Sequence, residues 1–461
     1  MRKYFLSLMI FCCLLLTTVQ AKAASINLSE EYLDKYFTSV AAASCVGVYK
    51  PDKSHEFDYL RNYGWQIDTY KGRSEDGAET NYSLAHNYIE TLGKHIYIMT
   101  FRGSVSKNDW QLNLKTDRVP YGGSDLPTME ALAQRKADRD EPAVHRGFNS
   151  YTLSVLKDFV LDESGNFRDL FRKIINDDDV HLILTGHSLG GAVATLLGER
   201  LTELGVPKEK FTVISFGAPA VGNNAFAEQY GNKINLLRIT NSKDPVPGSL
   251  QTFFGGYKQF GEHYVYGVSS KVSSVQHDSA MYFDYSVSEY YKAYDEEIAA
   301  GRIAPIPDTY VTEGIPTVAV WMVSGDGSDV IKSVVDSSRF FTGELQAMLP
   351  SRIVMSRNLR TDELAAQDYV GVSRASGAEY IFVCELGGSR ARTDDYHFML
   401  VNCSLYKSDG RLVFINSWAK KVTPSIGNIH VAGVILSEIS KELRKEMPFV
   451  ALGTAAGASR M

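Results

Sequence analysis

One serine sits where a strand, a tight turn and a helix should meet, and it is the first residue that could do chemistry. Ser188 lies in the segment 180–204, VHLILTGHSLGGAVATLLGERLTEL. The apolar run before it is typical of a parallel strand covered on both faces. Gly186 and Gly190 remove the Cβ atom where the turn is too crowded to hold one. The pattern predicts a nucleophilic hydroxyl at a helix N-terminus, where developing negative charge is favoured.

A serine nucleophile needs a base beside it and an acid that orients the base. In sheets with this strand–turn–helix elbow the three residues follow in the chain order Ser, Asp or Glu, His. Asp244 lies in NSKDPVP, 241–247, just after an expected strand at 234–239. Its loop should therefore lie at the same sheet edge as Ser188. An Asp before a Pro is also common in ordinary turns, so this residue alone does not decide the acid.

Three histidines could stand near the nucleophile. His277 precedes a short apolar segment that could anchor its loop, and His263, in Gly261–Tyr264, competes with it for the role of base. His187 is adjacent to Ser188 in the chain and points the wrong way for a base. We expect His187 to be packed or hydrogen-bonded inside the elbow.

Hydrolysis through a tetrahedral intermediate also needs donors for the oxyanion. The backbone N–H of Leu189, next after the nucleophile, supplies one donor in such elbows. Ser104 follows the apolar strand expected at 95–101 and supplies a second, through its backbone N–H and its hydroxyl. The alternative for Arg102-Gly103-Ser104 is a simple turn that ends the strand.

Together these pieces resemble one family, the class 3 lipases, which include fungal triacylglycerol lipases and related plant and bacterial acyl hydrolases. The matching segments occur in the family's order across roughly residues 30–290: TFRGS at 100–104, NDW at 108–110, VHRGF at 144–148, GHSLGG at 186–191, FGAP at 216–219, NSKDPVP at 241–247, and His277 with Tyr282.

The resemblance implies an α/β-hydrolase fold and a role for each site residue. It makes Ser188 the nucleophile, Asp244 the acid, His277 the base, and Ser104 and Leu189 the oxyanion donors, with no metal or organic cofactor. It also favours a structural role for His263. The implied substrate is an acylglycerol or a phospholipid. Segment 105–114, where fungal members carry a lid, is only weakly amphipathic here.

Strands that alternate with helices predict a mostly parallel central sheet with helices on both faces. We read the polar stretch 117–142 as a covering loop. The expected helices are 29–46, 145–161, one that ends near 176, 189–204 and 286–300, and the expected strands are 63–70, 81–86, 95–101, 180–187, 211–216 and 234–239.

The chain divides into five parts by composition. Residues 1–24 carry Arg2 and Lys3, an apolar run and an Ala-Lys-Ala cleavage site, which predicts a signal peptide and an exported protein, periplasmic or secreted and bacterial. The other parts are a lipase-like α/β-hydrolase domain at 25–301, a linker at 302–316, a smaller α/β domain at 317–448 and a flexible tail at 449–461.

The smaller domain has its own alternation of strands and helices. Gly377–Ile381 and Lys407–Arg411 give it a weak resemblance to small domains of bacterial envelope proteins, such as curli-secretion lipoproteins and lipoprotein activators of cell-wall synthases. That resemblance implies an envelope partner, and the alternative is a packing domain without activity. The expected strands are 317–323, 352–355, 379–385, 397–406 and 411–418, and the expected helices are 329–349, 361–367 and 429–446.

Composition excludes some functions and leaves others open. The 461 residues carry a net charge of −6, so no basic footprint for nucleic acid is present. After signal cleavage Cys45, Cys384 and Cys403 remain, and the last two fall in neighbouring strands, as a disulfide or as buried free thiols. No cysteine or histidine spacing is typical of a metal site.

The sequence therefore predicts a serine ester hydrolase that cleaves lipid acyl esters, with peripheral contact to a lipid surface. The alternatives are a short-chain esterase and a non-catalytic envelope protein that uses the hydrolase fold as a scaffold.

Overall fold

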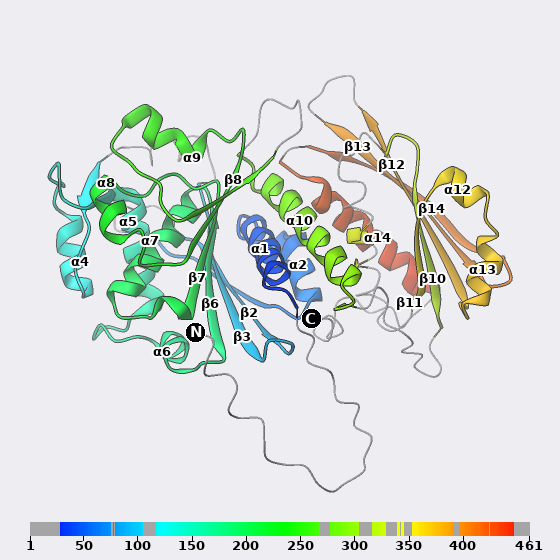
Figure 1. Ribbon diagram of the computed structural model, residues 1–461, viewed down its shortest axis with the longest axis horizontal. Coiled ribbons are helices and arrows are strands. Elements are labelled where there is room, and N and C mark those ends of the chain that lie inside the picture. Colours follow the sequence, from blue (N-terminus) through cyan, green and yellow to red (C-terminus); the bar gives the residue numbers. More distant parts are fainter. Residues whose placement is uncertain are drawn as a thin grey trace, which may run out of the picture.

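The computed structural model describes most of the chain between residues 28 and 446 (Figure 1). The predicted signal peptide at 1–24, most of the linker at 302–316 and the tail at 449–461 lie outside the described residues, as do the NDW motif and segment 105–114. The described residues are 28–74, 77, 79–104, 117–267, 277–303, 316–328, 339–341, 343–344, 353–390, 396–423 and 425–446.

A seven-stranded sheet forms the centre of the larger domain, in the order β1-β2-β3-β6-β7-β8-β9. The pairs β1–β2 and β2–β3 are antiparallel, and every pair from β3 to β9 is parallel. This confirms the predicted α/β class with a mostly parallel sheet. The strands are β1 Gln66–Tyr70, β2 Tyr82–Ile89, β3 Lys94–Phe101, β6 Val180–His187, β7 Phe211–Phe216, β8 Leu236–Asn241 and β9 Glu262–Tyr266.

Helices cover both faces of this sheet because its central strands are apolar on both sides (Figure 1). In β6, Leu182 and Leu184 pack in the core under α7, while Ile183 between them packs in the core under α1. The helices on the α7 side are α5 Arg146–Val155, α6 Asp169–Asn176 and α7 Leu189–Glu203, and those on the other side are α1 Glu30–Gly47, α2 His55–Asn62 and α10 Ser279–Ala299.

Two local predictions in this domain placed the start of an element wrongly, and one strand was not predicted. The strand expected at 63–70 begins only at Gln66, because α2 occupies the residues before it and Gly64 turns the chain with a φ of +83°. The helix expected at 286–300 begins at Ser279. Segment 262–266 forms the edge strand β9, whose residues are mostly exposed, so no burial pattern marks it in the sequence.

The polar stretch 117–142 is not only a covering loop. It begins with β4 Arg118–Pro120, which pairs with β5 Ala143–His145, and continues into α4 Leu126–Ala133. Asp125 accepts a hydrogen bond from the Thr128 N–H at 2.8 Å and so caps that helix. Two further short helices in this domain are α8 Asn224–Tyr230 and α9 Val246–Ser249.

A second sheet of five strands forms the smaller domain, in the order β11-β10-β12-β13-β14. Its first three strands are parallel and its last three are antiparallel. Of the helix expected at 329–349, only 339–341 and 343–344 are described, and they are helical. The elements are β10 Val318–Ser324, β11 Ile353–Arg360, α12 Thr361–Ala365, α13 Tyr369–Ala375, β12 Tyr380–Arg390, β13 His397–Lys407, β14 Leu412–Val422 and α14 Asn428–Glu446.

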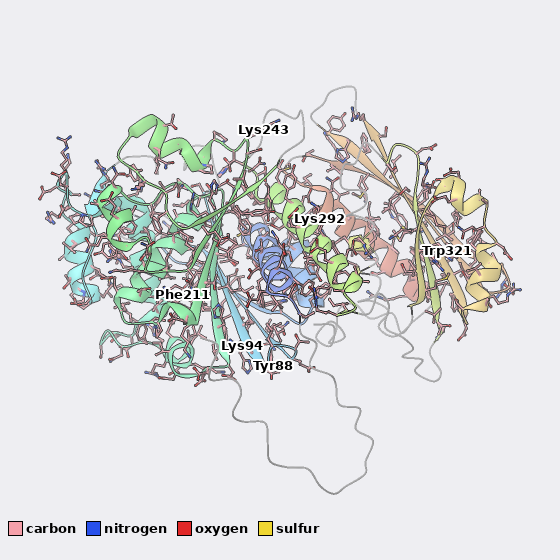
Figure 2. The ribbon with its side chains drawn as sticks, viewed as in Figure 1. Tyr88, Lys94, Phe211, Lys243, Lys292 and Trp321 are labelled. Carbon is pink, nitrogen blue, oxygen red and sulfur yellow. The ribbon has the colours of Figure 1, made fainter. Side chains whose placement is uncertain are left out.

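Strand β10 is buried on both faces at the centre of this second sheet. Val320 packs in the core beneath α14, and Trp321 packs on the opposite face beside α13, where its Nε1–H donates to Ser373 Oγ at 2.8 Å (Figure 2). On β12 and β13, Cys384 and Cys403 pair directly across the strands with their sulfur atoms 3.4 Å apart. Both are buried free thiols in this structure.

The two domains share one apolar core where α14 lies against α2 and α10 (Figure 1). The N-terminus of α14 is capped from the larger domain. Asp284 of α10 accepts hydrogen bonds from the N–H groups of Asn428 at 2.7 Å and Ile429 at 3.0 Å. His430 Nδ1 then lies 2.5 Å from Glu56 Oε1 of α2.

The His430–Glu56 pair should make the junction pH-sensitive. The hydrogen bond to Glu56 raises the pKa of His430 above 6.5. Burial opposes ionisation of Glu56, but the hydrogen bond and charge of His430 lower its pKa below 4.5. The stabilisation is lost as pH rises through the pKa of His430 or falls through that of Glu56. It is therefore largest between about pH 4.5 and 6.5.

Replacing His430 with Gln should cost about 2 kcal/mol of unfolding free energy near pH 5.5, because a buried carboxylate loses its charged partner. The difference in Tm between wild type and variant should shrink above pH 8. Thermal unfolding across pH 4–9 measures it, and a Tm difference that does not change with pH would contradict this reading of the pair.

Candidate active site

Ser188 stands at the end of β6 with a backbone conformation that few residues adopt. Its φ of 59° and ψ of −126° make it the one non-glycine among the described residues with a positive φ. Such strain is typical of a nucleophile elbow, where the turn holds the hydroxyl clear of the sheet. The helix α7 begins at the next residue, Leu189.

Glycines make this elbow possible because neighbouring backbone fills the space where Cβ atoms would lie. A Cβ on Gly190 would overlap the carbonyl oxygen of Phe101 in β3 and lie 2.8 Å from its carbon. A Cβ on Gly186 would overlap the backbone of Gly190 itself. The strand, the turn and the neighbouring strand therefore approach more closely than alanine allows.

Replacing Gly190 with Ala should lower the free energy of unfolding by about 3 kcal/mol or more, because backbone rather than a movable side chain must shift. Gly433 on α14 is the matched control, since an added Cβ there meets nothing within 4 Å. Its replacement by Ala should leave stability unchanged or raise it by up to about 1 kcal/mol. Urea unfolding compares the two, and equal stabilities would contradict the packing account.

The structure brings Ser188, His277 and Asp244 together. His277 Nε2 lies 2.7 Å from Ser188 Oγ, and His277 Nδ1 lies 2.7 Å from Asp244 Oδ2. Asp244 follows β8 and His277 precedes α10, so three loops at one sheet edge supply the three residues. A carboxylate can only accept, so Nδ1 carries the proton and Nε2 accepts the serine hydroxyl. This arrangement can deprotonate Ser188 as it attacks.

Asp244 is held rigidly from several sides. Its side chain is fully buried, whereas that of His277 is 24% exposed. Asp244 Oδ2 accepts from the Tyr282 hydroxyl at 2.6 Å, and Oδ1 accepts from the Val246 N–H at 2.9 Å. Tyr282 in turn accepts from the Asn241 N–H at 3.0 Å. Burial and the Asp244 charge raise the pKa of Tyr282 well above 10, so it stays a donor.

His187 is packed inside the elbow, as expected from its place in the chain. It is buried, its ring centroid lies 4.5 Å from that of His277, and its Nδ1 lies 3.2 Å from the Tyr49 hydroxyl. Burial and the neighbouring His277 hold the pKa of His187 well below 6.5. The ring therefore stays neutral and does not repel positive charge on His277.

His263, the competing base, lies on the edge strand β9 instead. Its Nε2 is 2.8 Å from Thr240 Oγ1 of β8, so its ring is engaged between two strands. The structure thus places His277, and not His263, against Ser188.

The residues predicted as oxyanion donors lie on two sides of the nucleophile. Leu189 is the first residue of α7. Ser104 follows Gly103, and a Cβ on Gly103 would lie 2.7 Å from the His187 carbonyl oxygen and 3.5 Å from Ser188 Cβ. The absence of that Cβ lets the 102–104 backbone approach the nucleophile closely. The geometry is compatible with the predicted role of both residues.

Two tyrosines at this site were not assigned a role from the sequence. Tyr282 is part of the family motif, but its hydrogen bond to Asp244 depends on how α10 packs against the loop after β8. Tyr49 lies 138 residues before its partner His187, and no local pattern links them. Within the described residues, no group of three or more His, Cys, Asp or Glu side chains could hold a metal ion. No helix described here is long and apolar enough to cross a membrane.

Comparison with known families identifies the region around Ser188. Residues 98–253 match the family model described as "Lipase (class 3)". Over these residues the chain is similar to the class 3 lipases. The region includes Ser104, Ser188 and Asp244, and His277 follows it by 24 residues (277 − 253).

Plant and fungal proteins align with the class 3 lipase region. Phospholipase A(1) DAD1, chloroplastic, of Arabidopsis thaliana is 34% identical over 169 residues, 35% of each chain. Secreted mono- and diacylglycerol lipase A of Penicillium cyclopium is 26% identical over 257 residues, 53% of this chain and 73% of its own. The solved lipase of Rhizopus microsporus var. chinensis is 25% identical and covers 53% of this chain and 75% of its own, with a TM-score of 0.38.

The match to the plant relatives is partial on both sides. This chain spans only 35% to 40% of the length of the plant phospholipases that it matches. The smaller domain, from β10 to α14, lies beyond the matched family region.

Proposed function

We propose that the protein is a serine hydrolase that cleaves acyl esters of lipids through an acyl-enzyme intermediate. The observation that carries the proposal is the hydrogen-bonded series from Ser188 Oγ through His277 to Asp244, with both distances at 2.7 Å. The buried carboxylate, the strained elbow and the class 3 lipase match are independent features that support it.

In this proposal the reaction has two halves. His277 Nε2 takes the Ser188 proton as Oγ attacks the ester carbonyl, and the oxyanion is held by the backbone N–H groups of Leu189 and Ser104. The C–O bond to the alcohol then breaks, and His277 gives the alcohol its proton. Water, deprotonated by His277, attacks the acyl-enzyme carbonyl. The Ser188 Oγ–acyl bond then breaks, His277 returns the proton to Oγ, and the fatty acid leaves. Asp244 keeps the imidazole in one tautomer throughout.

The proposed substrate class is an acylglycerol or a phospholipid. The names of the plant and fungal relatives, which are phospholipase A(1) and mono- and diacylglycerol lipase, support a lipid ester. We also propose that the protein works in peripheral contact with a lipid surface, because such esters are presented there.

We further propose a division of labour along the chain. Residues 25–301 would carry the chemistry, 302–316 would link the domains, and 317–448 would bind an envelope component or serve packing alone. The contacts of α14 with α2 and α10 support a smaller domain that stabilises the larger one. The signal-like residues 1–24 support export, to a periplasm or outside the cell.

A substrate panel tests the proposed activity. The wild type is assayed on p-nitrophenyl butyrate, p-nitrophenyl palmitate, an emulsified triacylglycerol and a phospholipid. We expect turnover of the soluble ester and of at least one lipid, with release of free fatty acid. Turnover confined to the soluble ester would make the protein a short-chain esterase. Absence of turnover on every substrate would overturn the proposal.

A further inference from the structure

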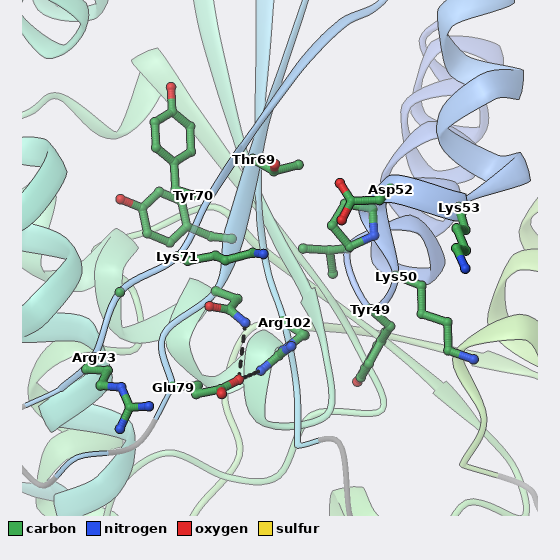
Figure 3. Close-up of a pocket in the computed structure, with 15 residues that line it drawn as sticks. Tyr49, Lys50, Asp52, Lys53, Thr69, Tyr70, Lys71, Arg73, Glu79 and Arg102 are labelled. Carbon is green, nitrogen blue, oxygen red and sulfur yellow. Dashed lines mark hydrogen bonds and ion pairs between the residues drawn. The ribbon is translucent and has the colours of Figure 1, made fainter.

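A cavity of about 690 Å³ lies beside the catalytic elbow, next to the residues that follow α1 (Figure 3). Four chain segments line it: 48–53 after α1, 69–73 at the end of β1, 79–82 at the start of β2, and Arg102 just after β3. None of the three residues of the proposed triad lines this cavity, so it is a separate site.

Two residues that line the cavity lie close to the backbone of the nucleophile elbow. Tyr49 lines it, and the Tyr49 hydroxyl lies 3.2 Å from Nδ1 of His187, the residue before Ser188. Arg102 also lines it and is followed by Gly103, where a Cβ would overlap the Tyr49 hydroxyl and lie 3.5 Å from Ser188 Cβ. A molecule in the cavity would therefore lie against the same backbone that approaches Ser188.

The lining of the cavity is strongly cationic, although the whole chain carries −6. Two carboxylates line it, and Glu79 is already used, because it accepts from Arg102 Nη2 at 2.5 Å. Four other cationic residues line the cavity, which has one further carboxylate, Asp52. Within the described residues these four side chains form no ion pair, and Figure 3 shows Lys71 extending into the pocket. They are Lys50, Lys53, Lys71 and Arg73.

The cavity also has an apolar wall. Tyr70 and Tyr82 both line it, and their rings stack with centroids 5.1 Å apart and planes 14° from parallel. A site lined by both cationic side chains and aromatic rings suits an amphiphile whose charge is negative and whose remainder is carbon-rich. Free phosphate can contact the cations of this site but has no carbon-rich part to pack on the aromatic rings.

We propose that this cavity binds the phosphate headgroup of an anionic ester lipid, while the acyl ester reaches Ser188. The inference rests on the proposed function and sharpens it, since it names the headgroup charge that the enzyme selects. A phosphate oxyanion would meet Lys71 and its cationic neighbours, and the glycerol backbone would lead past Tyr49 toward the nucleophile. An enzyme built in this way prefers anionic phospholipids to neutral acylglycerols of the same acyl length.

The test uses lipids that are soluble as monomers, so that surface charge plays no part. Dihexanoyl phosphatidylglycerol is the anionic substrate, dihexanoylglycerol is the neutral one, and both are assayed below their critical micelle concentrations. The variants are Lys71→Glu, the charge-conserving Lys71→Arg, and Lys441→Glu as a matched control. Lys441 is an exposed lysine on α14 and does not line the cavity.

Lys71→Glu should lower kcat/KM for the anionic lipid roughly 10-fold, because a favourable solvent-exposed charge contact becomes a repulsive one. Its kcat/KM for the neutral lipid and for p-nitrophenyl butyrate should not change. Lys71→Arg and Lys441→Glu should behave as wild type. Inorganic phosphate should inhibit hydrolysis of the anionic lipid in the wild type, and less so in Lys71→Glu.

Other results would overturn the inference in distinguishable ways. An anionic-to-neutral ratio that Lys71→Glu leaves unchanged would overturn headgroup binding, and inhibition by phosphate in that case would mark a free-phosphate site. An equal loss in Lys441→Glu would mark long-range charge only. A wild type inactive on p-nitrophenyl butyrate would overturn the proposed function as well.

Discussion

Replacing Ser188 with Ala is expected to lower kcat on any acyl ester by about 10⁵-fold, the scale lost when a serine nucleophile is removed. The hydroxyl that forms the acyl-enzyme is the only atom deleted. The loss should therefore appear in kcat rather than in KM, because substrate contacts are kept. Initial rates on p-nitrophenyl butyrate measure it most simply.

The control for this variant separates chemistry from folding. Ser164 is exposed in a turn, and Ser164→Ala should keep wild-type activity. Both variants should unfold within about 2 °C of the wild type, since each loses one oxygen atom. If Ser188→Ala kept more than a few per cent of the wild-type rate, Ser188 would not be the nucleophile.

Replacing Asp244 with Asn is the second large effect, an expected loss of about 10⁴-fold in kcat. An amide at this position can turn its NH₂ toward His277 Nδ1, which forces the proton onto Nε2. His277 then donates toward Ser188 instead of accepting its proton. The Val246 N–H donates to Oδ1, so it favours the amide oxygen at that position and leaves the NH₂ at the Oδ2 position beside His277.

The Asp244→Asn variant should still bind substrate. We expect KM on p-nitrophenyl butyrate to change less than about threefold while kcat collapses, as for an interaction realised only in the transition state. Asp178→Asn is the control, because that carboxylate is exposed and pairs with Lys210 on the surface. Activity of Asp244→Asn within tenfold of the wild type would remove Asp244 from the proposed triad.

Most of the site residues could be predicted from the sequence because local patterns mark them. The glycines around Ser188 have a steric cause that can be read without a fold, and Asp244 follows a strand at the expected sheet edge. The choice between His277 and His263 needed either the family resemblance or the structure. Only the structure shows His263 against Thr240, away from the nucleophile.

Contacts distant in sequence could not be predicted in this way. Tyr49 meets His187 only because α1 packs on the sheet beside β6, and Tyr282 meets Asp244 only because α10 packs against the loop after β8. The strand β9 has no burial alternation, and its existence depends on pairing with β8. By contrast β13 buries alternate residues, and both β12 and β13 begin within one residue of the predicted positions.

The packing between the two domains likewise could not be predicted from sequence patterns. The glycine and proline residues near 302–316 predict a linker between two units. They do not predict that Asp284 caps α14 or that Glu56 contacts His430. Burial at the junction raises the pKa of Asp284 to about 6. These contacts bring a carboxylate of α10, the helix that His277 precedes, to the smaller domain.

The most direct measurement of the central claim is covalent trapping with an alkyl p-nitrophenyl phosphonate. Ser188 Oγ should attack phosphorus, form a P–O bond and expel p-nitrophenolate, a change that mimics the first half of ester hydrolysis. We predict one equivalent of p-nitrophenol per protein, a matching mass increase on the peptide that contains Ser188, and neither in Ser188→Ala. A label on another residue, or equal labelling of Ser188→Ala, would contradict Ser188 as the nucleophile.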